Sequence, residues 1–124
     1  MAIELLFVGL GGFFGSICRF LLTRISLHYG AVFYWGTLLS NVIAGVLVGL
    51  VFTLEGAKHF SPRTVLLLRT GFLGGLSTFS AFSLETVRYA QAGSYGWAGL
   101  NIALNLFLSL AGVLLGQAIG KAIS

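Results

Sequence analysis

Glycines and hydroxyl side chains gather in one apolar stretch, which is the first candidate for chemistry in this sequence. Residues 71–83 read Gly-Phe-Leu-Gly-Gly-Leu-Ser-Thr-Phe-Ser-Ala-Phe-Ser. If this stretch crosses a bilayer, its polar groups need partners or a water-filled path. Paired glycines followed by four hydroxyls favour a helix broken near residues 74–78, with freed backbone groups facing a cavity or an ion. The alternative is a kinked packing helix whose hydroxyls bond back one turn.

Phe79 and Phe82 belong to this stretch, and their spacing of three residues places both rings on one face of a helix. An aromatic ring is negative on its faces and positive at its edge. Two ring edges beside the hydroxyls of Ser80 and Ser83 would therefore solvate a small anion without any fixed charge. The alternative is that the two phenylalanines face lipid or pack against other helices.

Amide side chains in two other apolar segments are further candidates. Asn41 lies in the middle of one segment, and Asn101, Asn105 and Ser109 recur at intervals of four residues in the last one. A polar stripe on one helix that faces an amide on another is typical of a pore wall rich in neutral hydrogen-bond donors. It also describes interhelical hydrogen bonds, which are worth about 0.6 kcal/mol on average within membranes.

Arg19 and Glu85 are the charges placed deepest in apolar segments. A charge at the bilayer centre costs about 2.5–3.5 kcal/mol on insertion scales, so such residues are expected to pair or to face water. Arg19 lies near the end of its segment, from which a long side chain can extend to the interface. The candidate partners of Glu85 are Arg88, one turn later, and Arg19, across helices.

The composition requires lipid as the solvent around these residues. Of the 124 residues, 57% are hydrophobic and 8% are charged, and the mean hydropathy is +1.00. Soluble domains have about a quarter of their residues charged. Because about 20 residues cross the hydrocarbon layer, the sequence predicts an all-α integral membrane protein with one transmembrane domain over residues 1–124. Its four predicted spans are about 3–24, 32–54, 64–90 and 95–120.

Small residues and aromatic residues indicate how these spans pack and where they end. Every span has two glycines four residues apart, a spacing that lets helix backbones touch. The pairs are Gly11 and Gly15, Gly45 and Gly49, Gly71 and Gly75, and Gly112 and Gly116. Tyr34, Trp35, Tyr95 and Trp97 are predicted to anchor helix ends at the membrane interface. Ser61 is a predicted cap for the third span, and Pro62 suits its first turn.

Basic residues are almost evenly divided between the two sides of the membrane. Four spans place both termini and the 55–63 loop on one side. That side has Lys58, Arg63, Arg69 and Lys121, and the other has Arg19, Arg24 and Arg88. Orientation follows the imbalance of Lys and Arg, and here the imbalance is a single residue. The sequence therefore predicts insertion in both orientations and an antiparallel, dual-topology homodimer.

Several classes of function are excluded or disfavoured. The basic residues are scattered singly, which argues against a nucleic-acid partner. The sequence has no phosphate loop for a nucleotide, no dinucleotide-binding motif and no motif of a soluble enzyme. His28 and His59 are expected in loops and not at a metal. No aspartate occurs, which argues against a divalent-cation site.

Three segments carry a resemblance to the Fluc/CrcB fluoride-channel family, and the likeness covers nearly the whole chain. Gly11, Gly12, Gly15 and Arg19 resemble the family's first-helix signature, and Gly36-Thr37-Leu38 with Asn41 resembles the second. The longest match is Gly-Gly-Leu-Ser-Thr-Phe-Ser-Ala-Phe-Ser-Leu-Glu at residues 74–85. Ala81 departs from the family pattern, in which Ser or Thr is common at this position.

The resemblance implies an antiparallel homodimer with two pores in a bacterial inner membrane, passive export of fluoride, and a structural Na⁺ at the dimer centre. The anion pore is assigned to Asn41, Phe79, Ser80, Phe82, Ser83, Asn101, Asn105 and Ser109. The family pattern places Na⁺ on the backbone carbonyls of Gly74 and Ser77. Arg19 and Glu85 are expected to be vestibule or structural charges. Fluoride, a second copy of the chain and membrane lipid are the expected partners.

Two other functions remain open from the sequence. A proton-coupled small multidrug exporter also has four helices, but it needs an intramembrane acid, and Glu85 is the only deep one here. A non-conducting membrane assembly subunit would instead require a partner protein. Conduction by the purified chain alone would exclude that requirement.

Overall fold

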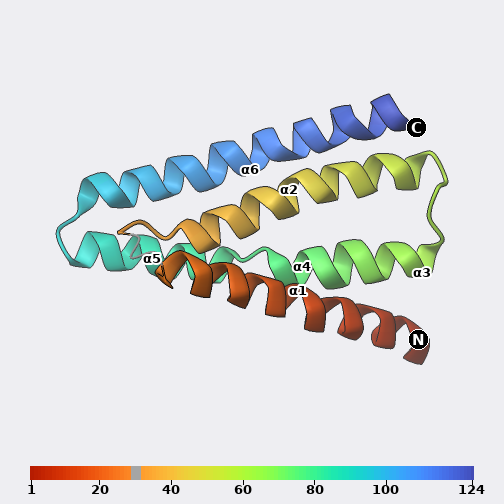
Figure 1. The fold of residues 1–124 in the computed structure, drawn as a ribbon, viewed down its shortest axis with the longest axis horizontal. Helices are drawn as coiled ribbons and strands as arrows, with labels where there is room; N and C mark the ends of the chain where they lie inside the picture. The colour runs from red at the N-terminus through yellow and green to blue at the C-terminus, as the bar shows by residue number, and fades with distance from the viewer. Residues whose placement is uncertain (29–31) are drawn as a thin grey trace.

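The chain folds into long antiparallel helices, and a computed structural model describes residues 1–28 and 32–124 (Figure 1). In chain order the elements are α1 (Ala2–His28), α2 (Trp35–Gly56), α3 (Pro62–Val65), η1 (Leu66–Leu73), α4 (Gly74–Leu76), α5 (Phe79–Gln91) and α6 (Tyr95–Ile123). Both termini lie at the same end of the molecule, as four spans require (Figure 1).

Four helical stretches are long and apolar enough to cross a membrane. They are Ala2–His28, Trp35–Gly56, Pro62–Gln91 and Tyr95–Ile123, and the shortest has 22 residues. At a rise of 1.5 Å per residue that helix is about 33 Å long, which matches a hydrocarbon core of about 30 Å. The predicted class, an all-α integral membrane protein with a broken third span, is confirmed.

The third span starts at its predicted cap, whereas the first helix is longer than predicted. The Ser61 hydroxyl accepts a hydrogen bond from the Thr64 backbone N–H at 3.2 Å, and Pro62 occupies the first turn, so the third span starts at Pro62. The first helix extends to His28, so the expectation that His28 lies in a loop is wrong. The connection through residues 29–31 lies outside the described residues.

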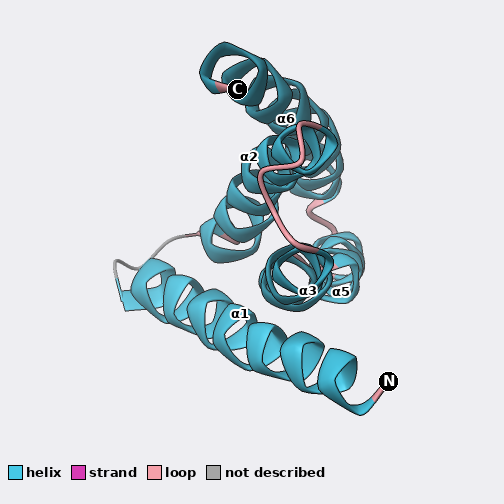
Figure 2. Ribbon diagram, turned by 90° about the vertical axis from the view of Figure 1, so that its right-hand side faces the viewer, coloured by secondary structure: helices cyan, strands magenta, loops and turns pink. Residues whose placement is uncertain are grey.

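Glycine pairs bring the helices into backbone contact. A Cβ on Gly45 of α2 would lie 2.7 Å from the Ser109 carbonyl oxygen of α6, and a Cβ on Gly75 of α4 would lie 2.8 Å from the Gly12 carbonyl of α1. The packing predicted from these pairs is therefore present. Viewed along the bundle, α1 lies against the rod of α3, η1 and α4, while α2 packs closely on α6 (Figure 2).

The third span contains the irregular backbone of the fold. From Leu66 to Leu73 it is a π-helix, whose wider turn leaves the regular i→i−4 ladder. A short α-helical piece follows, and the span then breaks at Ser77 and Thr78 before α5 starts at Phe79. The break falls within the predicted region, whereas the π-helix had no sequence signal.

Aromatic residues gather at the end of the bundle where α2 and α6 start and α5 finishes. The Phe33 ring lies 4.9 Å from the Trp35 ring and 5.9 Å from the Trp97 ring, between centroids. Tyr89 stacks on both Phe33 and Trp97. Amphipathic rings of this kind suit the membrane–water boundary, so one end of the bundle carries most of the interfacial anchoring.

Candidate functional site

The break in the third span is formed by two residues in extended backbone conformation. Ser77 has ψ 154°, and Thr78 has φ −154° and ψ 119°. The Thr78 hydroxyl accepts a hydrogen bond from the Ala81 N–H at 3.1 Å and so caps the N-terminus of α5. The Ser77 hydroxyl donates to the Leu73 carbonyl at 2.9 Å, which completes the turn before the break.

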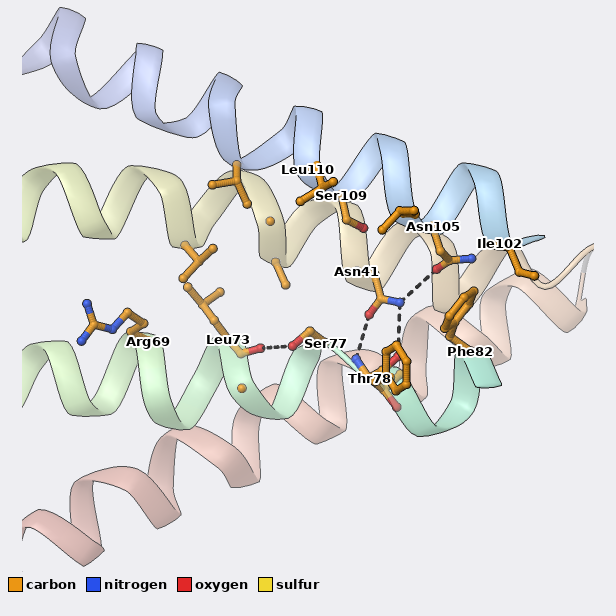
Figure 3. Close-up of a pocket in the computed structure, with 17 residues that line it drawn as sticks. Asn41, Arg69, Leu73, Ser77, Thr78, Phe82, Ile102, Asn105, Ser109 and Leu110 are labelled. Atoms are coloured by element: carbon orange, nitrogen blue, oxygen red, sulfur yellow. Dashed lines mark hydrogen bonds between the residues drawn. The ribbon is translucent and has the colours of Figure 1, made fainter. Parts of the chain in front are cut away.

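Asn41 of α2 holds the broken backbone in place. Its Oδ1 accepts a hydrogen bond from the Thr78 N–H at 2.7 Å, and its Nδ2 donates to the Thr78 carbonyl at 3.2 Å (Figure 3). The same Nδ2 donates to Oδ1 of Asn105 in α6 at 3.0 Å. One amide thus replaces the helix partners that Thr78 has lost and ties three spans together.

The amide stripe on α6 continues this network toward α5. Asn105 Nδ2 donates to the Asn101 carbonyl at 2.9 Å and to Asn101 Oδ1 at 3.0 Å. Asn101 Nδ2 donates to the Thr86 hydroxyl at 3.0 Å, and Asn101 is 0% exposed. The interhelical-bonding interpretation therefore describes Asn101 better than the pore-wall interpretation.

Breaking the helix also frees backbone carbonyls. In a continuous α-helix the Gly74 carbonyl would accept from the Thr78 N–H, and the Ser77 carbonyl from the Ala81 N–H. The Thr78 N–H donates instead to Asn41, and the Ala81 N–H donates to the Thr78 hydroxyl. Two carbonyl oxygens at mid-span are thereby left without their helical donors.

A groove of about 630 Å³ runs along this face of the protomer. One wall brings together much of the predicted pore and metal site. Aliphatic residues of α2 and α6, together with Arg69, Leu73 and Thr78, form the rest. The predicted residues that line it are Asn41, Gly74, Ser77, Phe79, Phe82, Asn105 and Ser109. No acidic side chain lines the groove in the part of the chain that the structure describes. Figure 3 shows Phe82, Asn105 and Ser109 around the break.

Two details of the groove bear on what it can hold. The Ser109 Oγ is buried and has no hydrogen-bond partner within the described ranges, 1–28 and 32–124. The Phe79 and Phe82 rings lie 5.5 Å apart between centroids with planes at 59°, and Phe79 is 78% exposed. A free hydroxyl and tilted rings are groups that can present O–H and C–H edges to an anion.

Three predicted pore residues do not line the groove of the single protomer. Ser80 lies beside Thr78, with 3.2 Å between their hydroxyl oxygens. The Ser83 hydroxyl donates to the Phe79 carbonyl at 2.8 Å, the bond-back arrangement considered above. Asn101 is enclosed by the amide network. Their pore role stays a prediction.

The deep charges are placed differently from the sequence expectation. Arg19 Nε donates to the Gly75 carbonyl at 3.1 Å and so joins α1 to α4. The Thr37 hydroxyl donates to Glu85 Oε2, while Glu85 Oε1 is buried and without a partner in the described part of the chain. Within the described residues Glu85 forms no close ion pair with Arg88 or Arg19, the two partners considered from the sequence. It points instead into the α2–α5 contact, where Thr37 reaches it.

Sequence reasoning missed two contributors to the site. Thr37 enters the sequence analysis only as part of a motif. Its contact with Glu85 has no sequence signal, because the contact depends on how the two helices are rotated. Arg69 was counted only as a loop-side charge, yet it lines the groove. Its place within an apolar run of η1 was the signal that could have found it.

A broken membrane span, held by an amide and flanked by a mainly apolar groove that no acidic side chain lines within the described residues, defines the class: a multi-pass membrane protein built to handle an ion within the bilayer. Residues 6–117 match the family described as "CrcB-like protein, Camphor Resistance (CrcB)". The chain belongs to this family.

Curated relatives are similar to this chain over nearly the whole length of both proteins. The "Fluoride-specific ion channel FluC" of Clostridium novyi is 40% identical over 118 residues, which cover 94% of this chain and 92% of the relative. The proteins of the same name from Shewanella sediminis and Shewanella loihica are each 44% identical over 115 residues, covering 92% of this chain and 93% of theirs.

Proposed function

We propose that this protein is a fluoride-selective ion channel that allows passive export of fluoride across the membrane. The observation that carries the proposal is the groove beside the broken span, which is lined by Ser109, Phe79 and Phe82. Among the described residues, the Ser109 hydroxyl has no hydrogen-bond partner and no acidic side chain lines the groove. The names of relatives with 40% identity and more supply the identity of the ion. This is the function of a channel and not of an enzyme.

The groove would act by replacing water around the ion. A small anion entering it loses hydration and gains the Ser109 O–H and the positive ring edges of Phe79 and Phe82. A wall that contains no carboxylate does not repel it. Transport needs no nucleotide, because the membrane potential alone contributes about 2.3 kcal/mol per 100 mV for one charge.

A second copy of the chain is part of the proposal. Phe79 and Gly74 are exposed on the single protomer although they lie near the middle of a membrane span. Freed carbonyls facing lipid would be costly, so we propose that an antiparallel copy covers this face. The nearly even division of basic residues supports insertion in both orientations. The membrane is proposed to be the bacterial inner membrane.

A structural Na⁺ is the proposed cofactor of this assembly. Carbonyls of unwound backbone at a half-helix C-terminus suit Na⁺, and the carbonyls of Gly74 and Ser77 have lost their helical donors. The ion would supply a fixed positive charge between two copies. Replacing all Na⁺ with N-methyl-D-glucamine should then lower dimer stability, and an unchanged dimer would exclude the site.

The exporter alternative gains no support from the placement of Glu85. This carboxyl is buried against Thr37 and does not line the groove, so a cation in the groove would not meet it. We therefore retain the channel as the proposed function.

Substitution of a ring in the groove tests the proposal. Phe82→Ile removes one ring edge while keeping an apolar side chain, so fluoride efflux from loaded liposomes should fall at least tenfold, a loss of about 1.4 kcal/mol in solvation of the ion. Phe13→Ile, an exposed ring on α1 remote from the groove, is the control and should leave efflux unchanged. Normal efflux from a dimeric Phe82→Ile variant would show that the ring is not part of the path.

A further inference from the structure

Arg69 connects the groove to a second, charged recess at the end of the bundle that holds the chain termini. This recess is lined by Phe52, Thr53, Glu55, Gly56, Arg69, Gln117 and Lys121. Arg69 is the one residue of the described chain that lines both the recess and the groove. Figure 3 shows it at the end of the groove remote from Asn105, with its guanidinium directed away from the break. An ion moving from this recess into the groove therefore passes Arg69.

The guanidinium is held by a single acidic partner. Arg69 Nη1 donates to Glu55 Oε2, and this is the only ion pair found within residues 1–28 and 32–124. The two side chains are 38% and 37% exposed, so the pair is open to water and to ions. A guanidinium has five N–H donors, and Glu55 occupies one of them in the described structure.

The charges around the recess favour an anion. Arg69 and Lys121 contribute two positive charges and Glu55 one negative charge, which leaves the recess with a net charge of +1. Clefts lined by one sign of charge raise the local concentration of the opposite ion and its rate of entry. Glu55 opposes this effect, because its carboxylate competes with an incoming anion for the same guanidinium.

We propose that Arg69 is the anion-recruiting residue at the outer end of the groove and that Glu55 limits its attraction by pairing with it. The ligand is the small permeant anion itself, so this inference rests on the proposed channel function. In an antiparallel pair of copies, each side of the membrane would carry one such recess.

Opposite effects of two neutralising variants distinguish recruitment from simple structural pairing. Both Arg69→Gln and Glu55→Gln break the same ion pair. If the pair only fastens η1 to α2, both variants should impair flux alike. Recruitment instead predicts that Arg69→Gln raises the half-saturating fluoride concentration about threefold to tenfold and that Glu55→Gln lowers it about twofold or more, with maximal flux little changed.

The measurement is initial fluoride efflux from liposomes at a series of fluoride concentrations, in low salt and in about 0.5 M sodium gluconate. The shifts should shrink in high salt, because exposed charges are screened. Arg69→Lys should retain most of the recruitment. Arg63→Gln removes the same charge from α3, outside both the groove and the recess, and should leave the concentration dependence unchanged.

Each result decides a separate point. If the unmodified protein conducts fluoride but Arg69→Gln and Glu55→Gln shift in the same direction or not at all, the recruiting role is wrong while the channel stands. If Arg69→Gln does not assemble, the direction of the Glu55→Gln shift decides alone. If the unmodified protein does not conduct, the proposed function itself fails.

Discussion

Hydrogen bonding at the level of single residues divides the polar groups of the spans into two kinds. Asn41, Asn101 and Asn105 have their amides occupied by protein partners and stabilise the break. The Ser109 Oγ, in contrast, is buried in the groove wall without a partner in the described part of the chain. Residues with satisfied hydrogen bonds stabilise the fold, whereas an unsatisfied buried donor needs an explanation. For Ser109 we propose contact with the ion.

This division predicts different consequences for Asn101 and Ser109. Asn101→Ala removes two side-chain hydrogen bonds, from Asn101 Nδ2 to the Thr86 hydroxyl and from Asn105 Nδ2 to Asn101 Oδ1, so it should lower the free energy of unfolding by about 1–3 kcal/mol. Ser109→Ala removes no protein hydrogen bond, so its effect on stability should be within about 0.5 kcal/mol. Fluoride efflux should nevertheless fall about tenfold in Ser109→Ala, because the ion loses a charge-assisted hydrogen bond.

Denaturation in detergent and liposome efflux, measured on the same preparations, check this prediction. An Asn101→Ala variant that remains folded should still conduct. Unchanged efflux from Ser109→Ala would remove this hydroxyl from the ion path.

Close contact between helices is what positions the site at the level of elements. Asn41 reaches Thr78 and Asn105 because α2 packs on α6 through glycines and lies beside the broken third span. The break itself needs this neighbour, since the released Thr78 backbone groups are satisfied from α2. Helix packing and the shape of the ion path are therefore coupled.

Adding one methyl group to the α2–α6 contact should disturb both the helix packing and the shape of the groove. The Cβ of Gly45→Ala would lie 2.7 Å from the Ser109 carbonyl oxygen, so the backbones must separate at a cost of about 1–3 kcal/mol. Thermal unfolding in detergent should show this loss together with reduced fluoride efflux. Gly99→Ala on α6 meets nothing within 4 Å and should be neutral or slightly stabilising. Equal stability of the two variants would contradict close packing at Gly45.

At the scale of the whole molecule, the single protomer leaves its ion-handling face uncovered. The groove lies on this face and is lined by Phe79 and by Gly74 and Ser77, whose carbonyls have lost their helical donors. The proposed antiparallel partner would cover these groups on a protein whose surroundings are lipid. The same arrangement would give each membrane side an Arg69 recess.

Dual insertion follows from the same account and is measurable in cells. Reporters that are active only on one side of the membrane, fused in turn to the C-terminus, should both give signal, because one residue separates the two basic counts. Adding two lysines after Ser124 should bias the orientation and shift the ratio of the two signals. A reporter found wholly on one face in the unmodified chain would end the dual-topology proposal.

Hydropathy and glycine spacing were enough to predict the four spans and their packing pairs, because lipid forces polar backbone to be satisfied within the protein. The residue pattern of the third span suited a break but left a kinked, continuous helix open. Polar residue types within the spans and the spacing of the two rings singled out Asn41, Phe79, Phe82, Asn105 and Ser109, which line one groove. Their role in a pore stays a prediction. The partner of Glu85 and the inward placement of Asn101 depend on helix rotation, which periodicity does not determine. The π-helix that contains Arg69 has no sequence signature, so the connection of groove and recess required the structure.

The most direct test of the account is ion efflux from liposomes that contain only this purified chain. Vesicles loaded with fluoride and chloride are given a potassium ionophore, and both anions are followed with selective electrodes. We predict rapid release of fluoride with chloride largely retained, because the groove offers a small anion neutral donors and ring edges in place of water. Vesicles that hold fluoride as tightly as protein-free controls would contradict the central claim.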